Sequence, residues 1–294
     1  MRCVVTGGAG FIGSNLALHL ENEGEEVVIV DNFKTGKEEN LAGFRGEIIK
    51  ADVSGKFDVN GKVDVIFHQA AITDPRHEND DETIRDNLSG FRNILSMAMD
   101  KKAKLIYASS ASMYGNGPAP QKEDQEKELF TAYSKSKLMI DNLAKEYLRK
   151  IHIVGLRYFN VFGPREKYKG RAASMIYHLA RQMKSGKNPR IFKMGEQRRD
   201  HIYVKDCVTA NIKAINGEPG VYNVGTGICT SFNDLIAMIN KSLGTNLKPE
   251  YIDNPYEKTY QKNTQADTSK TEKHLGFKAR YGLQKAINEY VVEL

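Results

Sequence analysis

The sequence predicts an α/β fold with a doubly wound parallel sheet, followed by a smaller C-terminal α+β substrate domain. In the first half, short apolar runs alternate with longer segments of helical periodicity. The short runs are apolar on both faces, as is typical of parallel strands that helices cover on both sides. After Gly163-Pro164 the elements become shorter and the alternation less regular. This change predicts a second unit with a different architecture.

The elements of the first half follow from these patterns in order. Strands are expected at 2–6, 26–30, 47–51, 63–69, 104–109 and 151–157. Helices are expected at 11–24, about 80–100 and about 125–150. Repeated strand–helix alternation of this kind favours a doubly wound sheet.

The second half mixes short strands with helices. A helix is expected at 171–187, before a turn at Pro189. Strands at 202–204 and 221–225 and helices at 231–244, 268–276 and 283–293 follow. We therefore predict a dinucleotide-binding domain over 1–165 and a substrate domain over 166–294, with segments of 191–225 able to return to the first domain.

Composition narrows the class of protein. The 294 residues, 40% of them hydrophobic, are enough for one large domain or two closely joined domains. The net charge of +6 is consistent with a Lys-rich solvated surface, or with a negatively charged small-molecule ligand. We expect no nucleic-acid partner, because neither a zinc-finger spacing nor a block of basic residues is present. The apolar runs are too short to span a membrane.

Localisation and metal content are predicted from the same sequence. The N-terminus leads directly into a strand, so we expect no secretory leader. Cys3, Cys207 and Cys229 have no disulfide or metal-ligand spacing, which fits a reducing cytoplasm. No H-x-x-x-H pair is present, so we expect no metal.

A glycine-rich turn joins the first strand to the first helix. The segment "VVTGGAGFIGSNLALHL" contains Gly7, Gly10 and Gly13. In a strand–turn–helix unit, these glycines allow a tight turn, a close approach of the backbone to a pyrophosphate, and packing of the helix on the sheet. The N–H groups at the start of the helix then face the anion. The turn predicts a bound dinucleotide.

Acidic residues after the next two strands are expected to contact adenosine. Asp31 can accept hydrogen bonds from the ribose hydroxyls, which favours NAD. Asn32, Lys34 and Lys37 follow, and could hold a 2′-phosphate instead. The choice between NAD and NADP is therefore open. Asp52-Val53 is placed to contact adenine.

A Tyr and a Lys stand four residues apart at the start of a helix, in "TAYSKSK". Tyr133 and Lys137 are expected to lie on one helical face. A tyrosine, with a reference pKa of about 10, is a poor base until nearby positive charge favours its ionised form. The alternative, that both are ordinary surface residues, loses weight because the glycine turn and the serines of "YASSASMYG" precede the pair. We predict that Tyr133 exchanges a proton with a substrate hydroxyl while the cofactor exchanges a hydride.

The segments T-G-G-A-G-F-I-G, S-S-A-S-x-Y-G, Y-S-K-S-K and R-Y-F-N-V-F-G-P-R resemble the extended short-chain dehydrogenase/reductases of the nucleotide-sugar epimerase and dehydratase type. The resemblance covers essentially the whole chain and implies a Rossmann domain and tightly bound NAD or NADP. It implies that Ser110 is the catalytic serine and that Tyr133 and Lys137 are the acid–base pair. The cofactor-binding residues that we predict are Gly7, Gly10, Phe11, Ile12, Gly13, Asp31, Asn32, Lys37, Asp52, Val53, Gln69, Ala70, Ala71, Asn87, Tyr133, Lys137 and Val161.

Later segments resemble the ADP-glycero-manno-heptose 6-epimerases, which carry G-P-R-E-x-x-K-G. The resemblance implies that Lys169 is a second acid–base. Oxidation at an exocyclic carbon gives a ketone that must be reduced on its other face, so each face needs its own proton donor unless the sugar turns over. Arg171 departs from the family pattern, which has a small Ser there. The predicted substrate-binding residues are Ser110, Asn160, Lys169, Arg171, His178, Phe192, Arg199 and Tyr260.

The resemblance implies an isomerase, a nucleotide-sugar epimerase. The alternative within the fold is a UDP-hexose 4-epimerase, which needs one acid–base because its intermediate flips. An alternative of a different class is a non-catalytic, cofactor-sensing Rossmann protein, although such proteins usually lose the Tyr or the Lys. By analogy with the family, we expect a homo-oligomer formed through the helices at 80–100 and 125–150.

Overall fold

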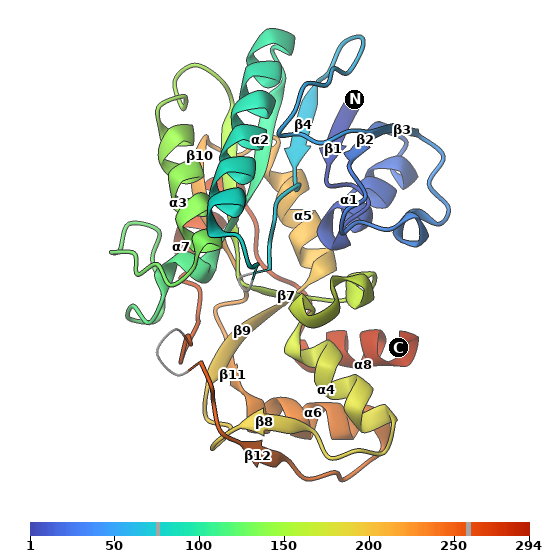
Figure 1. The fold of residues 1–294 in the computed structure, drawn as a ribbon, viewed down its shortest axis with the longest axis vertical. Helices are drawn as coiled ribbons and strands as arrows, with labels where there is room; N and C mark the ends of the chain where they lie inside the picture. The colour runs from blue at the N-terminus through green and yellow to red at the C-terminus, as the bar shows by residue number, and fades with distance from the viewer. Residues whose placement is uncertain (75–76, 257–259) are drawn as a thin grey trace.

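A seven-stranded parallel sheet forms the upper half of the molecule in Figure 1. The computed structural model describes residues 1–74, 77–256 and 260–294, and the number of strands given for the sheet refers to these residues. The strands of the sheet are β1 (Arg2–Thr6), β2 (Glu26–Asp31), β3 (Glu47–Lys50), β4 (Val65–His68), β5 (Lys104–Ser110), β6 (Ile153–Tyr158) and β10 (Gly220–Val224). All neighbouring pairs are parallel.

The order of the strands is β10-β6-β5-β4-β1-β2-β3. The chain first adds strands on one side of β1 (β2, β3) and then, from β4 on, adds them on the other side, so a switch point lies between β1 and β4. Such a switch point leaves a crevice at the carboxyl ends of the strands, where ligands bind in open α/β sheets. The predicted doubly wound α/β fold is confirmed.

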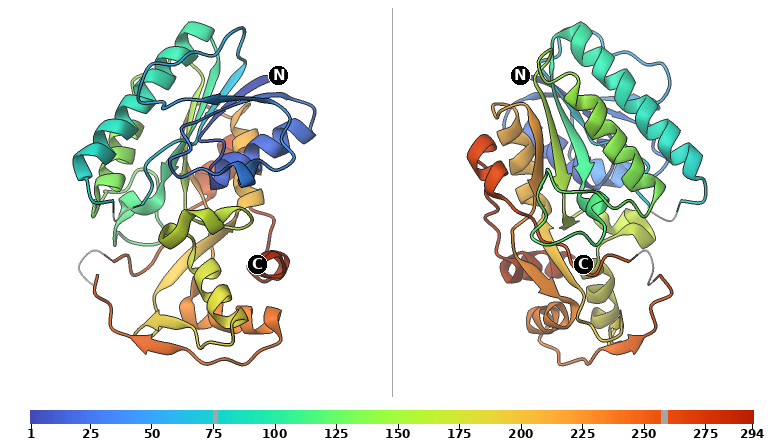
Figure 2. Two further views of the ribbon diagram at one scale, coloured as in Figure 1. Left: turned by 45° about the vertical axis from the view of Figure 1, so that its right-hand side comes forward. Right: turned by 90° about the vertical axis from the view of Figure 1, so that its left-hand side faces the viewer.

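Helices cover both faces of the sheet. Helices α2 (Asp80–Lys101) and α3 (Ala132–Lys145) lie side by side on one face, and α1 (Phe11–Asn22) and α5 (Val204–Ala214) lie together on the other (Figure 2). Side chains alternate along β1, so Val4 packs into the core with Phe91 of α2 and Ile140 of α3, whereas Val5 packs with Leu16 of α1. Both faces of the strand are therefore buried, as its apolar sequence predicts.

A smaller α+β unit lies below the sheet in Figure 1. Its strands are β7 (Asn160–Phe162), β8 (Arg190–Phe192), β9 (Arg198–Tyr203), β11 (Cys229–Ser231) and β12 (Glu250–Ile252), paired as β11-β9-β7 and β12-β8. Its helices are α4 (Met175–Lys184), α6 (Phe232–Leu243) and α8 (Leu283–Glu293), which share one apolar core. Helix α7 (Ser269–Leu275) packs on β10 and α5 instead. Short 3-10 turns are η1 (Glu38–Leu41), η2 (Ala111–Tyr114) and η3 (Glu166–Ala172).

The structure corrects two expected elements. The strand expected at 202–204 runs over Arg198–Tyr203, and Val204 already begins α5, which the sequence pattern does not predict. The first turn of α5 is fixed by a distant segment, because the Asp206 carboxylate accepts the backbone N–H groups of Arg280 and Tyr281. The helix expected at 171–187 begins only at Met175, where the Ser174 hydroxyl caps it by accepting the N–H of Tyr177.

None of the described helices is both long and apolar enough to cross a membrane.

Candidate active site

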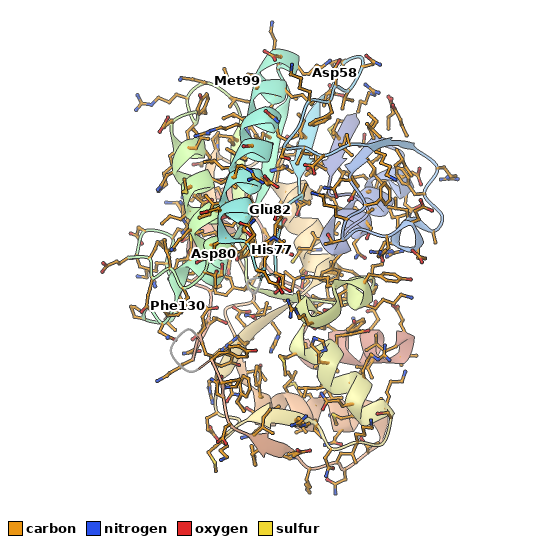
Figure 3. All side chains as sticks on the ribbon, viewed as in Figure 1. Asp58, His77, Asp80, Glu82, Met99 and Phe130 are labelled. Atoms are coloured by element: carbon orange, nitrogen blue, oxygen red, sulfur yellow. The ribbon has the colours of Figure 1, made fainter. Side chains whose placement is uncertain are left out.

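A cavity of about 1280 Å³ opens at the carboxyl ends of the central strands and continues into the smaller unit. Its wall includes the β1–α1 turn, the ends of β2, β4 and β5, the start of α3, and residues of η3, β8 and β9. His77 and Glu82, labelled in Figure 3, lie on its wall near the start of α2, with 3.2 Å between the His77 Nε2 and Glu82 Oε2 atoms. The cavity is therefore shared by both parts of the molecule.

The glycine turn lies at one end of the cavity. Gly7 has a φ of +66°, in the left-handed region that favours glycine. A Cβ atom on Gly13 would lie 2.1 Å from the Gly7 carbonyl oxygen, so only glycine lets α1 pack this closely on the turn. Gly10 caps α1 without a side-chain hydrogen bond, which leaves the N–H groups of the first helical turn available to a ligand. These features fit the pyrophosphate of a dinucleotide.

The Asp31 carboxylate closes this turn at the end of β2. Its oxygens accept the N–H groups of Ala9 at 2.9 Å and Phe33 at 2.8 Å. Burial raises the pKa of Asp31, and the two N–H groups oppose that shift by stabilising the carboxylate. Asp31 therefore holds the turn in place as well as facing the cavity, where its free lone pairs remain available to ribose hydroxyls.

Asp52 is hydrogen-bonded to Asn32, another predicted cofactor-binding residue. Asn32 Nδ2 donates to Asp52 Oδ2 at 2.8 Å, and the Lys34 ammonium lies 3.5 Å from the same oxygen. The Ser54 hydroxyl donates to Asp52 Oδ1 at 2.7 Å, and this bond is the largest of the effects that lower the pKa of Asp52 to about 2. Lys37 lines the same end, with its backbone N–H bonded to Ala9 O at 3.0 Å.

The segment after β4 carries the next predicted cofactor contacts. Gln69 Nε2 donates to Asn211 Oδ1 at 3.1 Å, and Ala70 passes so close to Gly7 that a Cβ there would lie 2.6 Å from the Ala70 nitrogen. Asn87 of α2 fixes this segment, since its side chain bonds both the N–H and the C=O of Ile72. All the predicted cofactor-binding residues line the one cavity.

Tyr133, Lys137 and Ser110 meet where α3 lies against the end of β5. The helix starts with a capping box, in which the Thr131 hydroxyl accepts the N–H of Ser134 at 3.1 Å. Tyr133 and Lys137 lie one turn apart, with the Lys137 Nζ atom 5.8 Å from the centre of the Tyr133 ring. The Lys137 ammonium donates to Ala108 O at 2.9 Å, and Ser110 is hydrogen-bonded to Tyr133. The predicted serine, tyrosine and lysine are therefore together.

Burial dominates the charge state of this group. It lowers the pKa of Lys137 to about 8, against the opposing influence of Asp141, and it raises the pKa of Tyr133, against the Ser110 hydrogen bond. Both shifts favour neutral side chains. A positive charge in the cavity beside Tyr133 would favour its ionised form, so a cationic nicotinamide bound there would make the tyrosine a better base.

Lys169 reaches the same cavity from η3. Its Nζ atom lies 5.6 Å from the centre of the Phe11 ring, near the start of α1. Burial lowers the pKa of Lys169, while the carboxylates of Glu166 and Asp74 oppose the shift. A lysine with a lowered pKa exchanges protons near neutral pH more readily than a solvated lysine.

Aromatic rings and an arginine form the far end of the cavity. The Phe192 and Tyr260 rings meet edge to face, with 5.4 Å between their centres. The Arg199 guanidinium lies 4.9 Å from the centre of the Tyr260 ring and is 8% exposed. Asn160 of β7 pairs in register with His201, two residues after Arg199, and its Nδ2 donates to Thr264 Oγ1 at 2.9 Å. A buried guanidinium beside aromatic rings suits a planar group joined to a phosphate.

Two predicted substrate contacts are not among the described residues that line the cavity. Arg171 is exposed, and its Nε atom lies 3.2 Å from Asp74 Oδ2. His178 lies on α4, where its ring packs edge-on against Tyr177 with 5.5 Å between centres. Asp74, in contrast, does line the cavity, so Arg171 reaches the site through Asp74 in this structure.

His201 on β9 is a cavity residue that the sequence does not single out. It pairs in register with Asn160 and is 4% exposed, and neither ring nitrogen has a hydrogen-bond partner within the described residues. Burial lowers its pKa to about 3, and the Arg199 charge adds to this effect. The segment "RRDHIYV" shows an alternating strand, but the chain that faces His201 is about forty residues away, so sequence alone does not reveal its surroundings.

The described residues hold no group of three or more His, Cys, Asp and Glu side chains that could bind a metal ion.

Comparisons with known proteins agree with this geometry. Residues 3–225 match the NAD dependent epimerase/dehydratase family, and the chain belongs to that family. The predicted family is thereby confirmed.

Several relatives have names that describe their activity. The ADP-L-glycero-D-manno-heptose-6-epimerase of Brachyspira hyodysenteriae is 40% identical over 285 residues, which are 91% of this chain and 89% of the relative. The crystal structure of the Helicobacter pylori ADP-L-glycero-D-manno-heptose-6-epimerase matches with a TM-score of 0.94 and 38% identity, covering 99% of this chain and 95% of that chain. A UDP-N-acetylglucosamine 4-epimerase from Methanobrevibacter ruminantium matches with a TM-score of 0.91 and 30% identity, covering 99% and 97%.

His201→Phe is expected to stabilise the protein. Phenylalanine keeps the ring that packs on Phe162 and removes two buried polar atoms that have no partner among the described residues, a gain of about 1 kcal/mol. Thermal unfolding at neutral pH should show a Tm higher by about 2 °C. The gain should grow as the pH falls from about 6.5 toward about 3, because unfolded His201 binds a proton there and the folded residue does not.

His152→Phe is the matched control, since the His152 ring is hydrogen-bonded to Ala214 O at 3.0 Å. This change should lower the Tm. A Tm that falls equally in both variants would show that His201 has a partner.

Proposed function

We propose that this chain is a nucleotide-sugar epimerase that works through transient oxidation and re-reduction of the sugar, with ADP-glycero-manno-heptose as the substrate class. Residues 1–165, with α5 and β10, bind the dinucleotide, and residues 166–294 hold the nucleotide sugar. The observation that carries the proposal is that Tyr133 and Lys169, from α3 and η3, line one cavity.

The two side chains provide the proton transfers. NAD, held by the glycine turn and by Asp31, would supply the acceptance of a hydride from the sugar carbon and its return. Tyr133, hydrogen-bonded to Ser110, takes the proton of the hydroxyl that is oxidised and can return it there. Lys169 supplies a proton to the oxygen when the ketone is reduced on the opposite face. Lys137 holds the Tyr133 end of the site through its bond to Ala108 O.

The substrate class is supported by the far end of the cavity and by the relatives. Arg199 and Asn160 suit a diphosphate, and the Phe192–Tyr260 ring pair suits a base. Relatives named as ADP-heptose 6-epimerases favour the heptose. A UDP-hexose 4-epimerase is the second candidate, because 4-epimerases share the fold. A non-catalytic sensor is not favoured, because Tyr133 and Lys137 are both in place.

We propose NAD rather than NADP as the cofactor, held tightly through the cycle. The family is NAD dependent, and Asp31 lies where a 2′-phosphate would be repelled. Lys34 lies beside Asp52, which reduces the positive charge available to such a phosphate.

Two further proposals concern the whole protein. Self-association through α2 and α3 is proposed because Met99 and Met139, one on each helix, are 43% exposed. A cytoplasmic location is proposed because Cys3, Cys207 and Cys229 are free thiols.

The proposal predicts epimerisation without net reduction of cofactor. Because the hydride returns to the same sugar, catalytic or no added NAD should suffice. The experiment incubates the protein with ADP-heptose, UDP-glucose, UDP-galactose and UDP-N-acetylglucosamine and follows product stereochemistry by NMR. Stoichiometric accumulation of NADH would instead indicate a dehydrogenase, and inversion of a UDP-hexose alone would favour the second candidate.

Tyr133→Phe is expected to lower kcat by about a hundredfold or more, the usual contribution of a positioned acid–base. The fold should remain, because the ring is kept. Steady-state kinetics with a Tm measurement tests this, with Tyr147→Phe, outside the cavity, as the control. Turnover near the wild-type rate would remove Tyr133 from the mechanism.

Lys169→Met separates the two candidate functions. Methionine keeps the unbranched stem and removes the ammonium, so epimerisation should fall by about a hundredfold. The half-reaction that uses Tyr133 should survive, and single-turnover absorbance at 340 nm should still show NADH formed from one epimer.

Lys167→Met is the matched control, because Lys167 is exposed and packs over Tyr168 on the same turn. If Lys169→Met epimerises as well as this control, the mechanism with two acid–bases is wrong and the 4-epimerase mechanism is favoured.

A further inference from the structure

A buried ion pair joins the catalytic helix to the central sheet. Asp141 of α3 and Arg157 of β6 are 0% and 1% exposed, with 2.8 Å between Arg157 Nε and Asp141 Oδ2. Neither residue lines the cavity in the described part of the chain, so neither contacts a ligand there. The pair is therefore not part of the predicted set of catalytic and binding residues.

Further polar atoms of the pair are also bonded. The Tyr107 hydroxyl donates to Asp141 Oδ1 at 3.0 Å. Arg157 Nη1 donates to the Tyr114 hydroxyl and to Glu123 O, both at 2.9 Å. Several hydrogen bonds from side chains and backbone hold this charge pair in one arrangement, so the pair fixes the groups attached to it.

The pair lies directly behind Lys137. Asp141 follows Lys137 by one helical turn, so both side chains leave the same face of α3. Lys137 is bonded to Ala108 O on β5, and β5 pairs with β6 so that the next residue, Ser109, stands opposite Arg157. Helix α3 is thus attached to two adjacent strands at two points, one turn apart.

We propose that Asp141 and Arg157 are positioning residues for the reaction: they set the depth of α3 on the sheet and the balance of charge around Lys137. Stability alone is a weak reason for such a pair, because replacing a buried ion pair by apolar groups is often neutral or stabilising. The proposal rests on the proposed acid–base role of Tyr133 and Lys137.

The other titratable side chains that face Lys137 are neutral, so they do not set the charge around it. Tyr133, on its own helix, and Tyr107, on β5, have raised pKa values and are neutral. His68 on β4 has a pKa lowered to about 3 and is neutral as well. The charge that acts on Lys137 is consequently that of Asp141, which raises the Lys137 pKa, and Arg157 is the ion-pair partner of Asp141.

Removing one charge at a time should move Lys137 in opposite directions. Asp141→Asn leaves the Arg157 cation uncompensated, so the pKa of Lys137 should fall by about one unit. Arg157→Met leaves the Asp141 anion uncompensated, so the pKa of Lys137 should rise by about one unit. The double variant removes both charges and should return the pKa to within about 0.3 unit of the wild type.

The pKa of Lys137 is measured by NMR in protein labelled with 13C at lysine Cε, with NAD added and with Lys137→Met used to assign the resonance. This measurement does not need activity, so it decides the proposal even if the protein epimerises nothing. In active protein, the alkaline limb of the kcat–pH profile should move to lower pH in Asp141→Asn and to higher pH in Arg157→Met. Unchanged Lys137 titration in folded Asp141→Asn and Arg157→Met would overturn the proposal.

The double variant Asp141→Asn/Arg157→Met decides the case in which either single variant fails to fold. It contains no unpaired buried charge, so it should fold. It should lose kcat by at least about tenfold with KM within about twofold of wild type, because a small misplacement of a catalytic group is costly. If kcat is lost in the double variant, the alkaline limb of its kcat–pH profile must remain at the wild-type pH, because both charges have been removed. A folded double variant with wild-type kcat would show that the pair is only structural.

Discussion

Helix α1 rests directly on the turn that leaves β1, and no atom larger than hydrogen fits at Gly13. A Cβ there would lie 2.1 Å from the Gly7 carbonyl oxygen. This close packing sets the start of α1 beside the end of the sheet and leaves its first N–H groups facing the cavity. The Asp31 carboxylate then holds the turn from β2 by accepting the N–H of Ala9. The position of the glycine turn at this end of the cavity depends on this one contact.

Several cationic side chains line the cavity, and burying them lowers the stability of the folded chain. Burial is the main cause of the lowered pKa values of Lys137, Lys169 and Arg199. Each of these cations would be stabilised by an anionic ligand, so a dinucleotide and a diphosphate sugar would recover part of the lost solvation. Anionic ligands of this kind would therefore be electrostatically complementary to the buried cations. The same burial brings the lysines toward the pKa range in which they exchange protons at neutral pH.

Carboxylates behind and beside the cavity adjust these charges. Asp141 acts on Lys137 from behind α3, and Glu166 with Asp74 acts on Lys169 from η3 and from the segment after β4. In both cases the carboxylate has another partner: Asp141 bonds Arg157, Glu166 Oε2 accepts the N–H of Ser174, and Asp74 lies beside Arg171. The two lysines are thus controlled by separate groups, which allows their protonation to differ in one cavity.

The sequence by itself determines the doubly wound sheet, the glycine turn and the family, because these depend on local periodicity and on residues close together in the chain. Gly7, Gly10 and Gly13 lie within one strand–turn–helix unit, and Tyr133 and Lys137 within one helical turn. Tertiary structure alone decides the features that depend on distant segments. Asp206 fixes the start of α5 only because Arg280 and Tyr281 return to it. His201 meets Asn160, Asp141 meets Arg157, and Arg171 meets Asp74 across strand pairing and domain packing that no local pattern encodes.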